Sequence, residues 1–270
     1  SGGLLLVVFK DNTNQWITGF YNASDLSEIA YISLGHNELD LSGAVMGTGK
    51  LYLSFSGPYA DTSYMTIINI PNHSVDANYA LVGDADWGPM ALGPGAIYHI
   101  SDSTGRLYRM NISNGEVTET QSGITPGIVG GMAYVPGYGI LATDFSGGTL
   151  YRLDDDGTFR NSWGIDQYPR IIAWDGYRFL VTSKPGVCPV SPSTGKLPSI
   201  IISGASTIAV SPDTELILVG CDDGVTSISV DGLEVLGSAL TPFAINLIAP
   251  TGHATAFASA QGSNKIYLLK

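Results

Sequence analysis

The sequence predicts an all-β fold, a β-propeller of four-stranded antiparallel blades, on the basis of three observations. A short motif of small and apolar residues recurs about every 40 residues. Most copies are followed by a turn rich in Gly, Pro or Asp and then by another apolar segment, which is the pattern of a β-hairpin. No stretch keeps apolar residues at i, i+3, i+4 and i+7, so helices of any length are not expected.

The motif copies mark the innermost strand of each blade, because that strand is buried on both faces and accepts only small or apolar side chains. The expected inner strands lie at 88–92, 130–135, 170–174, 206–210 and 244–249, with a looser copy at Gly43-Ala44-Val45-Met46. Later in two adjacent repeats stand Asn114-Gly115 and Asp156-Gly157, the dipeptides that two-residue hairpin turns require. Each repeat therefore has four strands, A to D, of decreasing apolar character.

These repeats give one domain over residues 1–270. Its expected blades are 1–42, 43–83, 84–123, 124–164, 165–204, 205–240 and 241–270. The two terminal blades lack a fourth strand. The first has segments typical of strands B to D, at residues 4–9, 16–21 and 28–34. The last has segments typical of strands A to C, at residues 243–249, 254–259 and 264–269. Seven blades are the preferred count. In the alternative of six, the two ends form one composite blade.

Composition excludes several classes of partner. The 12 Lys and Arg against 24 Asp and Glu give a net charge of -12, whereas nucleic acids and anionic membranes are bound through clustered basic residues. The longest apolar stretch, 4–9, is too short to span a bilayer, so no transmembrane segment is expected. Cationic ligands or neutral sugars suit this charge better.

Three Asn-x-Ser sequons, at Asn22, Asn72 and Asn111, are candidate glycosylation sites. Together with few lysines and many Ser, Thr and Asn residues, they favour an extracellular or cell-surface setting. Cys188 and Cys221 are a candidate disulfide, with two free thiols as the alternative, because a chain of this length can be stabilised by burial alone.

Two segments resemble known propeller families. The run Ile208-Ala209-Val210-Ser211-Pro212-Asp213, followed by Leu216–Gly220 and Asp223-Gly224-Val225, resembles the repeat of the YVTN and lactonase-like propellers. The segment from Met132 to Leu153 is similar to a blade of the gluconolactonase-like propellers. The resemblance implies the propeller fold. It also supplies the alternative function, a hydrolase or cyclase that acts at the channel mouth.

Gluconolactonase-like enzymes hold a divalent cation with Glu, Asp and Asn side chains where the inner strands begin. The corresponding positions here are Ser42, Trp87, Gly130, Arg170, Ser206 and Phe243. They offer no converging carboxylates for a hard cation, and the four histidines show no metal-binding spacing. We therefore expect no catalytic residue, no metal and no cofactor.

The D-to-A and B-to-C connections of all blades emerge on one face around the channel, where propellers usually bind ligands. The candidate ligand-binding residues in these connections are Trp87, Tyr168, Arg170, Phe243, Tyr59 and Asp144. Aromatic rings beside carboxylates stack on sugars and accept their hydroxyl hydrogen bonds. Trp87-Gly88 and Trp163-Gly164 resemble the Trp-Gly pairs of lectin-like propellers, with packing of these rings between blades as the alternative.

The sequence thus favours a non-catalytic extracellular or cell-surface propeller that binds a glycan or protein partner, or that serves as a structural surface module. The lactonase-like enzyme is the alternative function.

Overall fold

The computed structural model describes residues 4–35, 39–56, 63–81, 88–102, 104–124, 127–211, 215–241, 244–252, 255–260 and 266–269. Within these ranges the regular elements are β-strands in antiparallel sheets, and no helix is long and apolar enough to cross a membrane. The fold class is confirmed as an all-β propeller of four-stranded antiparallel blades. The chain forms two compact units, residues 1–101 with 107–119 and residues 102–106 with 120–270.

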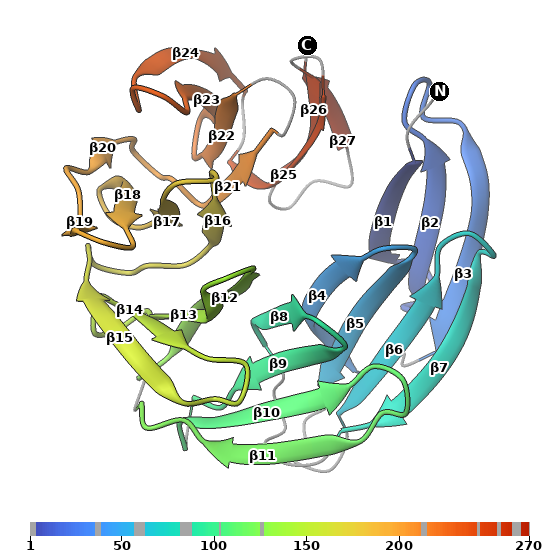
Figure 1. The fold of residues 1–270 in the computed structure, drawn as a ribbon. Coiled ribbons are helices and arrows are strands. Elements are labelled where there is room, and N and C mark those ends of the chain that lie inside the picture. The colour runs from blue at the N-terminus through green and yellow to red at the C-terminus, as the bar shows by residue number, and fades with distance from the viewer. Residues whose placement is uncertain are drawn as a thin grey trace. The chain divides into compact units, whose positions relative to one another are not determined.

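The first unit contains three sheets (Figure 1). The first sheet consists of β1 (Leu4–Lys10), β2 (Trp16–Asn22) and β3 (Glu28–Gly35). The second consists of β4 (Asp40–Gly47), β5 (Lys50–Ser56), β6 (Tyr64–Asn69) and β7 (Ser74–Ala80). The third consists of β8 (Met90–Gly93), β9 (Ala96–Ile100), β10 (Arg106–Asn111) and β11 (Val117–Gln121). Two apolar clusters, one containing Phe20 and Phe55 and the other Met65 and Ile97, lie between successive sheets.

The second unit contains four sheets. The first consists of β12 (Val129–Val135), β13 (Gly139–Asp144), β14 (Thr149–Leu153) and β15 (Phe159–Gly164). The second consists of β16 (Ile172–Trp174), β17 (Phe179–Thr182) and β18 (Gly186–Ser191), with β19 (Gly195–Lys196) and β20 (Ile200–Ile201) both paired to β18. The third consists of β21 (Thr207–Val210), β22 (Leu216–Cys221), β23 (Gly224–Ser229) and β24 (Val235–Leu240), and the last of β25 (Ile245–Gly252), β26 (Thr255–Ala260) and β27 (Ile266–Leu269).

The outer strands are the most exposed, as expected, but the second strand of a blade is more buried than the innermost one, as β5 is than β4 and β13 than β12. Strand β13 is buried along its whole length, whereas β24, the outermost strand of its sheet, is exposed along its whole length. The expected inner strands coincide with β8, β12, β16, β21 and β25, with starts shifted by one or two residues. The three terminal strands expected at each end also form.

The preferred count of seven blades is wrong, and the structure fits the alternative of six. Four sheets have four strands, and a fifth has its outer strand divided into β19 and β20, which gives five complete blades. The terminal sheets, β1–β3 and β25–β27, have three strands each in the described residues. The count was too high because each incomplete end was scored as a blade of its own.

The candidate disulfide is also wrong, because Cys188 and Cys221 are buried free thiols. Cys188 belongs to the apolar cluster that contains Trp163 and Phe179, whereas Cys221 belongs to the next cluster, which contains Leu180. Successive strand residues such as Phe179 and Leu180 point to opposite faces of a sheet. The β16–β20 sheet thus separates the two thiols, and burial raises the pKa of both.

Two of the sequon asparagines close the turn that leads to the outermost strand of their sheets, β3 after Asn22 and β11 after Asn111. The Asn111 Oδ1 atom accepts hydrogen bonds from the Ser113 N–H at 2.9 Å and from the Ser113 hydroxyl at 2.7 Å. Asn22 accepts the same pair of bonds from Ser24. Asn72 is exposed in the turn before β7. The Asn-x-Ser pattern therefore has a local structural role, and glycosylation stays a prediction.

Candidate functional site

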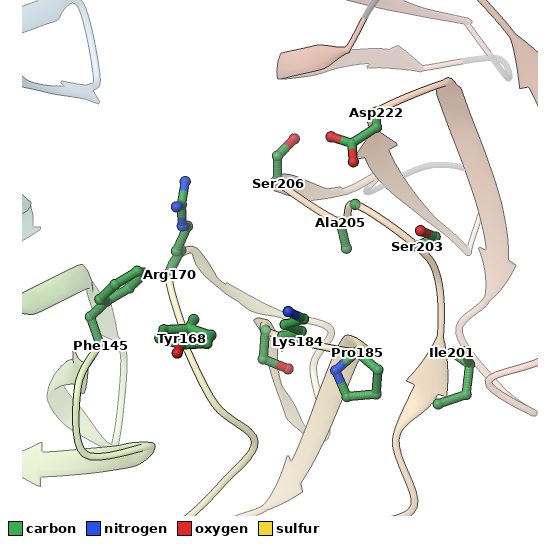
Figure 2. Close-up of a pocket in the computed structure, with 12 residues that line it drawn as sticks. Phe145, Tyr168, Arg170, Lys184, Pro185, Ile201, Ser203, Ala205, Ser206 and Asp222 are labelled. Carbon is green, nitrogen blue, oxygen red and sulfur yellow. The ribbon is translucent and has the colours of Figure 1, made fainter.

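A cavity of about 590 Å³ lies in the second unit, where connections of three successive blades come together (Figure 2). The β13–β14 turn supplies Phe145, and the β15–β16 loop supplies Tyr168 and Arg170. The β17–β18 turn supplies Lys184, and the opposite wall consists of residues 203–206 and Asp222 from the next blade. All of these are D-to-A or B-to-C connections, so the cavity lies on the face that the sequence singled out.

The Phe145 ring lies between the two candidate residues of the β15–β16 loop. Its centroid is 5.2 Å from that of Tyr168, with the rings tilted by 49°. The guanidinium carbon of Arg170 lies 5.2 Å from the Phe145 centroid, within the range of a cation–π contact. Both Tyr168 and Arg170 remain exposed, and 46% of the Tyr168 surface is accessible. One wall of the cavity is therefore aromatic and carries a positive charge.

The loop that carries these residues is fixed by main-chain bonds to its own blade. The Arg170 N–H donates to the carbonyl of Thr182 at 2.9 Å, and the Thr182 N–H donates to that of Ile171 at 3.0 Å. The Thr182 hydroxyl oxygen accepts the Ile171 N–H at 3.0 Å. The Lys184 N–H donates to the Gln167 carbonyl at 2.8 Å. These bonds hold Tyr168 at a φ of +56°, a conformation that non-glycine residues seldom adopt.

Two glycines of β12, in the preceding blade, let the β15–β16 loop approach that strand closely. A Cβ atom at Gly131 would overlap the carbonyl oxygen of Arg170, and one at Gly130 would overlap that of Pro169. The Thr143 hydroxyl, one strand further out, lies 3.2 Å from the Arg170 carbonyl oxygen and 3.3 Å from that of Gly131. The small residues of the repeated motif thus create the space in which the next blade's loop is seated.

A polar cluster on the outer side of the same loop also restrains it. The half-buried Asp166 carboxylate accepts hydrogen bonds from the Lys196 ammonium and from the Ser199 hydroxyl. Burial alone would raise the pKa of Asp166, but these bonds outweigh it and hold the pKa below its ordinary value. The Lys196 pKa is raised by the same contact. The base of the Tyr168 loop is therefore linked to the outer strands of its blade.

Asp144 does not line the cavity. Its side chain is buried, and its Oδ1 atom accepts the N–H groups of Ser146 at 3.0 Å and Gly147 at 2.8 Å. The next residue, Phe145, donates its N–H to the Ile128 carbonyl at 2.8 Å. Asp144 therefore shapes the turn from which Phe145 enters the cavity.

The opposite wall combines hydroxyl groups with a carboxylate. The Ser206 hydroxyl hydrogen-bonds to the carbonyl oxygens of Gly220 and Ile245. Asp222 is exposed and packs over Gly204, whose φ of +67° and close approach leave no room for a side chain. Figure 2 shows Arg170 extending into the cavity, with Phe145 on one side and Ser206 and Asp222 on the other.

The predicted site residues lie in different parts of the molecule. Tyr168 and Arg170 lie together in the cavity. Trp87, Phe243 and Tyr59 lie outside the described residues. Trp163 is buried and packs against Phe179 with ring centroids 5.7 Å apart, so the inter-blade interpretation is confirmed for this ring.

Sequence reasoning did not single out Phe145 or Lys184 as ligand-binding residues, and it considered Asp222 only with Asp223, as a weak cation site in a predicted B-to-C loop. All three stand in B-to-C turns, the same class of connection that drew attention to Asp144. Among the described residues, no group of three or more His, Cys, Asp or Glu side chains is arranged to hold a metal. The expectation that the chain binds no metal stays a prediction.

No family model matches this chain, and no curated protein does. Among solved structures it is similar to the dihydro-heme d1 dehydrogenase NirN in complex with DHE, with 13% identity, a TM-score of 0.68 and coverage of 98% of this chain. The match spans 60% of that chain. Kuenenia stuttgartiensis hydrazine synthase is also similar, with 15% identity, a TM-score of 0.69 and coverage of 88% of this chain and 80% of that one. At these identities the likeness shows the fold alone.

Proposed function

We propose that this chain is a non-catalytic binding module and that it binds a glycan in the cavity beside Tyr168. The observation that carries the proposal is a half-exposed aromatic ring that faces hydroxyl and charged groups across a cavity of about 590 Å³. A sugar ring needs this combination, because its apolar face stacks on an aromatic ring while its hydroxyl groups exchange hydrogen bonds with polar side chains. The alternative is that the cavity is the active site of a propeller enzyme of the lactonase type.

The hydroxyl chemistry favours binding over hydrolysis. A serine nucleophile needs a base within hydrogen-bond reach. Ser206, which lines the cavity and directly precedes β21, instead directs its hydroxyl to two main-chain carbonyl oxygens. Its contact with Ile245 joins successive blades, so the side chain has a structural use.

The setting we propose is extracellular or at the cell surface. The acidic, lysine-poor composition and the three sequons support it. Asn22 and Asn111 end β2 and β10, and Asn72 stands in the turn before β7, so all three lie at the connections that lead to outer strands. Treating the protein from its natural source with a peptide-N-glycosidase should lower its mass. An unchanged mass would argue against this setting.

The glycan proposal is tested by replacing the aromatic ring. Tyr168→Ala should weaken glycan binding about tenfold or more, which corresponds to about 1.4 kcal/mol, because the stacking surface is lost. Binding is measured by calorimetry with the glycans that the wild-type chain retains in an array screen.

Tyr177→Ala is the matched control. Tyr177 belongs to the same blade, is 73% exposed and stands in the β16–β17 turn, away from the cavity. The control should bind as the wild type does, and both variants should melt within a few degrees of it. Equal binding by Tyr168→Ala and the wild type would contradict the proposal.

A further inference from the structure

The charge of the cavity differs in sign from that of the whole chain. Although the protein has a net charge of -12, the described lining holds two cations, Arg170 and Lys184, against one carboxylate, Asp222. In the part of the chain that the structure describes, neither Arg170 nor Lys184 forms an ion pair with a carboxylate, whereas cations such as Arg160, Arg178 and Lys196 do. The charges of Arg170 and Lys184 are therefore not neutralised by a described carboxylate.

We propose that the sugar bound in this cavity is acidic, carrying a carboxylate that Arg170 recognises. This inference rests on the proposed function and specifies its ligand class. The guanidinium lies over the face of Phe145, at 5.2 Å from the ring centroid. Figure 2 shows the guanidinium extending into the cavity, where the N–H groups at its edge can donate to a ligand. Two parallel N–H donors at that edge match the two oxygens of a carboxylate.

The neighbouring groups suit the remainder of a sugar acid. Tyr168, whose ring is next to Phe145, offers an apolar surface beside the guanidinium. Asp222 and Ser206, on the other side of Arg170, are acceptors for sugar hydroxyl groups. Asp222 also disfavours a second negative charge in the cavity. The lining thus fits a monoanionic uronic acid unit better than a phosphate monoester, which carries nearly two charges at neutral pH.

The test compares each sugar acid with its own methyl ester. The probes are trisaccharides of galacturonic, glucuronic and mannuronic acid, and the fully methyl-esterified form of each, which keeps the shape and removes the charge. We expect at least one acid to bind tenfold or more tightly than its ester in low-salt calorimetry. The preference should decrease with added salt, because screening weakens exposed charge pairs.

The variant Arg170→Gln should weaken binding of the acid about tenfold and leave binding of its ester unchanged. Arg160→Gln is the matched control. Arg160 is exposed on β15 and paired with Asp154, and it does not line the cavity, so its loss should change neither affinity. The inference is overturned if the ester binds as tightly as the acid, or if Arg170→Gln weakens both equally.

The two proposals can fail separately. If neutral sugars or esters bind, and Tyr168→Ala abolishes that binding without any preference for acids, the glycan site stands and the acidic ligand is wrong. If no probe and no array glycan binds, the proposed function falls, and this inference falls with it. Inorganic phosphate is the competing anion, and its displacement of a bound sugar acid at equal concentration would contradict the preference for a carboxylate.

Discussion

At the scale of single residues, buried side chains outside the cavity lining determine where the cavity residues stand. Asp144 is the clearest case, because its carboxylate accepts two main-chain N–H groups in the turn that presents Phe145. Two threonine hydroxyl groups hold the β15–β16 loop: that of Thr143 donates to the Arg170 carbonyl oxygen, and that of Thr182 accepts the Ile171 N–H. An aspartate at a strand end and two threonines in strands could equally bind a ligand, so residue type alone does not show that these side chains support the turns and loop of the cavity.

We predict that Asp144→Ala destabilises the protein by about 1–3 kcal/mol, because two turn N–H groups lose a charged acceptor. Chemical denaturation measures the change. Asp144→Asn, which keeps an oxygen acceptor at the same place, should recover most of the stability. If the alanine variant is as stable as the wild type but loses glycan affinity, then Asp144 is a ligand-binding residue after all.

At the scale of elements, the repeated small-residue motif is explained by contact between blades. The motif predicts the inner strands, which form although they are only partly buried, and its glycines face the backbone of the next blade. Gly131 faces the Arg170 carbonyl in the second unit, and Gly43 faces the Gly88 carbonyl in the first. In both units, therefore, an inner strand and the following blade approach more closely than any side chain would allow.

Gly131→Ala should destabilise the protein by about 1–3 kcal/mol, because the added methyl group forces the Arg170 backbone to shift. The same shift should reduce affinity for the ligand. Gly164→Ala on β15 is the matched control, since a Cβ there meets nothing within 4 Å. Equal denaturation midpoints for the two alanine variants would show that the close approach is dispensable.

At the scale of the whole molecule, acid should destabilise the fold. The pKa values of Asp11, Asp25, Asp154, Asp156 and Asp166 are all held below the ordinary value. For the first four, the largest cause is a hydrogen bond donated within the adjoining turn or hairpin. A carboxyl group with a depressed pKa stabilises the folded state at pH above its unfolded value and loses that contribution as pH falls through its folded value.

The melting temperature should therefore be nearly constant from pH 7 to about pH 5 and should drop between about pH 4 and pH 2. Thermal unfolding at each pH measures this profile. In Asp166→Asn, the drop should be smaller, since this variant lacks the carboxylate that Lys196 and Ser199 stabilise. A profile that is flat down to pH 2 would mean that these carboxylates add nothing to stability.

Local sequence determined the fold class and most strand positions. Strand alternation, the inner-strand motif and turn residues such as Asn111 and Gly115 act over a few neighbours, so they can be interpreted without knowing the tertiary structure. The same reasoning assigned the candidate ligand-binding face, because D-to-A and B-to-C connections emerge together in any propeller. It identified Tyr168 and Arg170, which do lie in one cavity.

Only the tertiary structure decided how side chains from different blades combine. The sequence does not show that Phe145 lies between Tyr168 and Arg170, or that Asp222 lies across from them, because these contacts join three blades. It likewise does not show that the β16–β20 sheet separates Cys188 from Cys221. The physical reason is common to all these cases. Blade geometry depends on local patterns, whereas a binding site or a disulfide depends on distances between residues far apart in the chain.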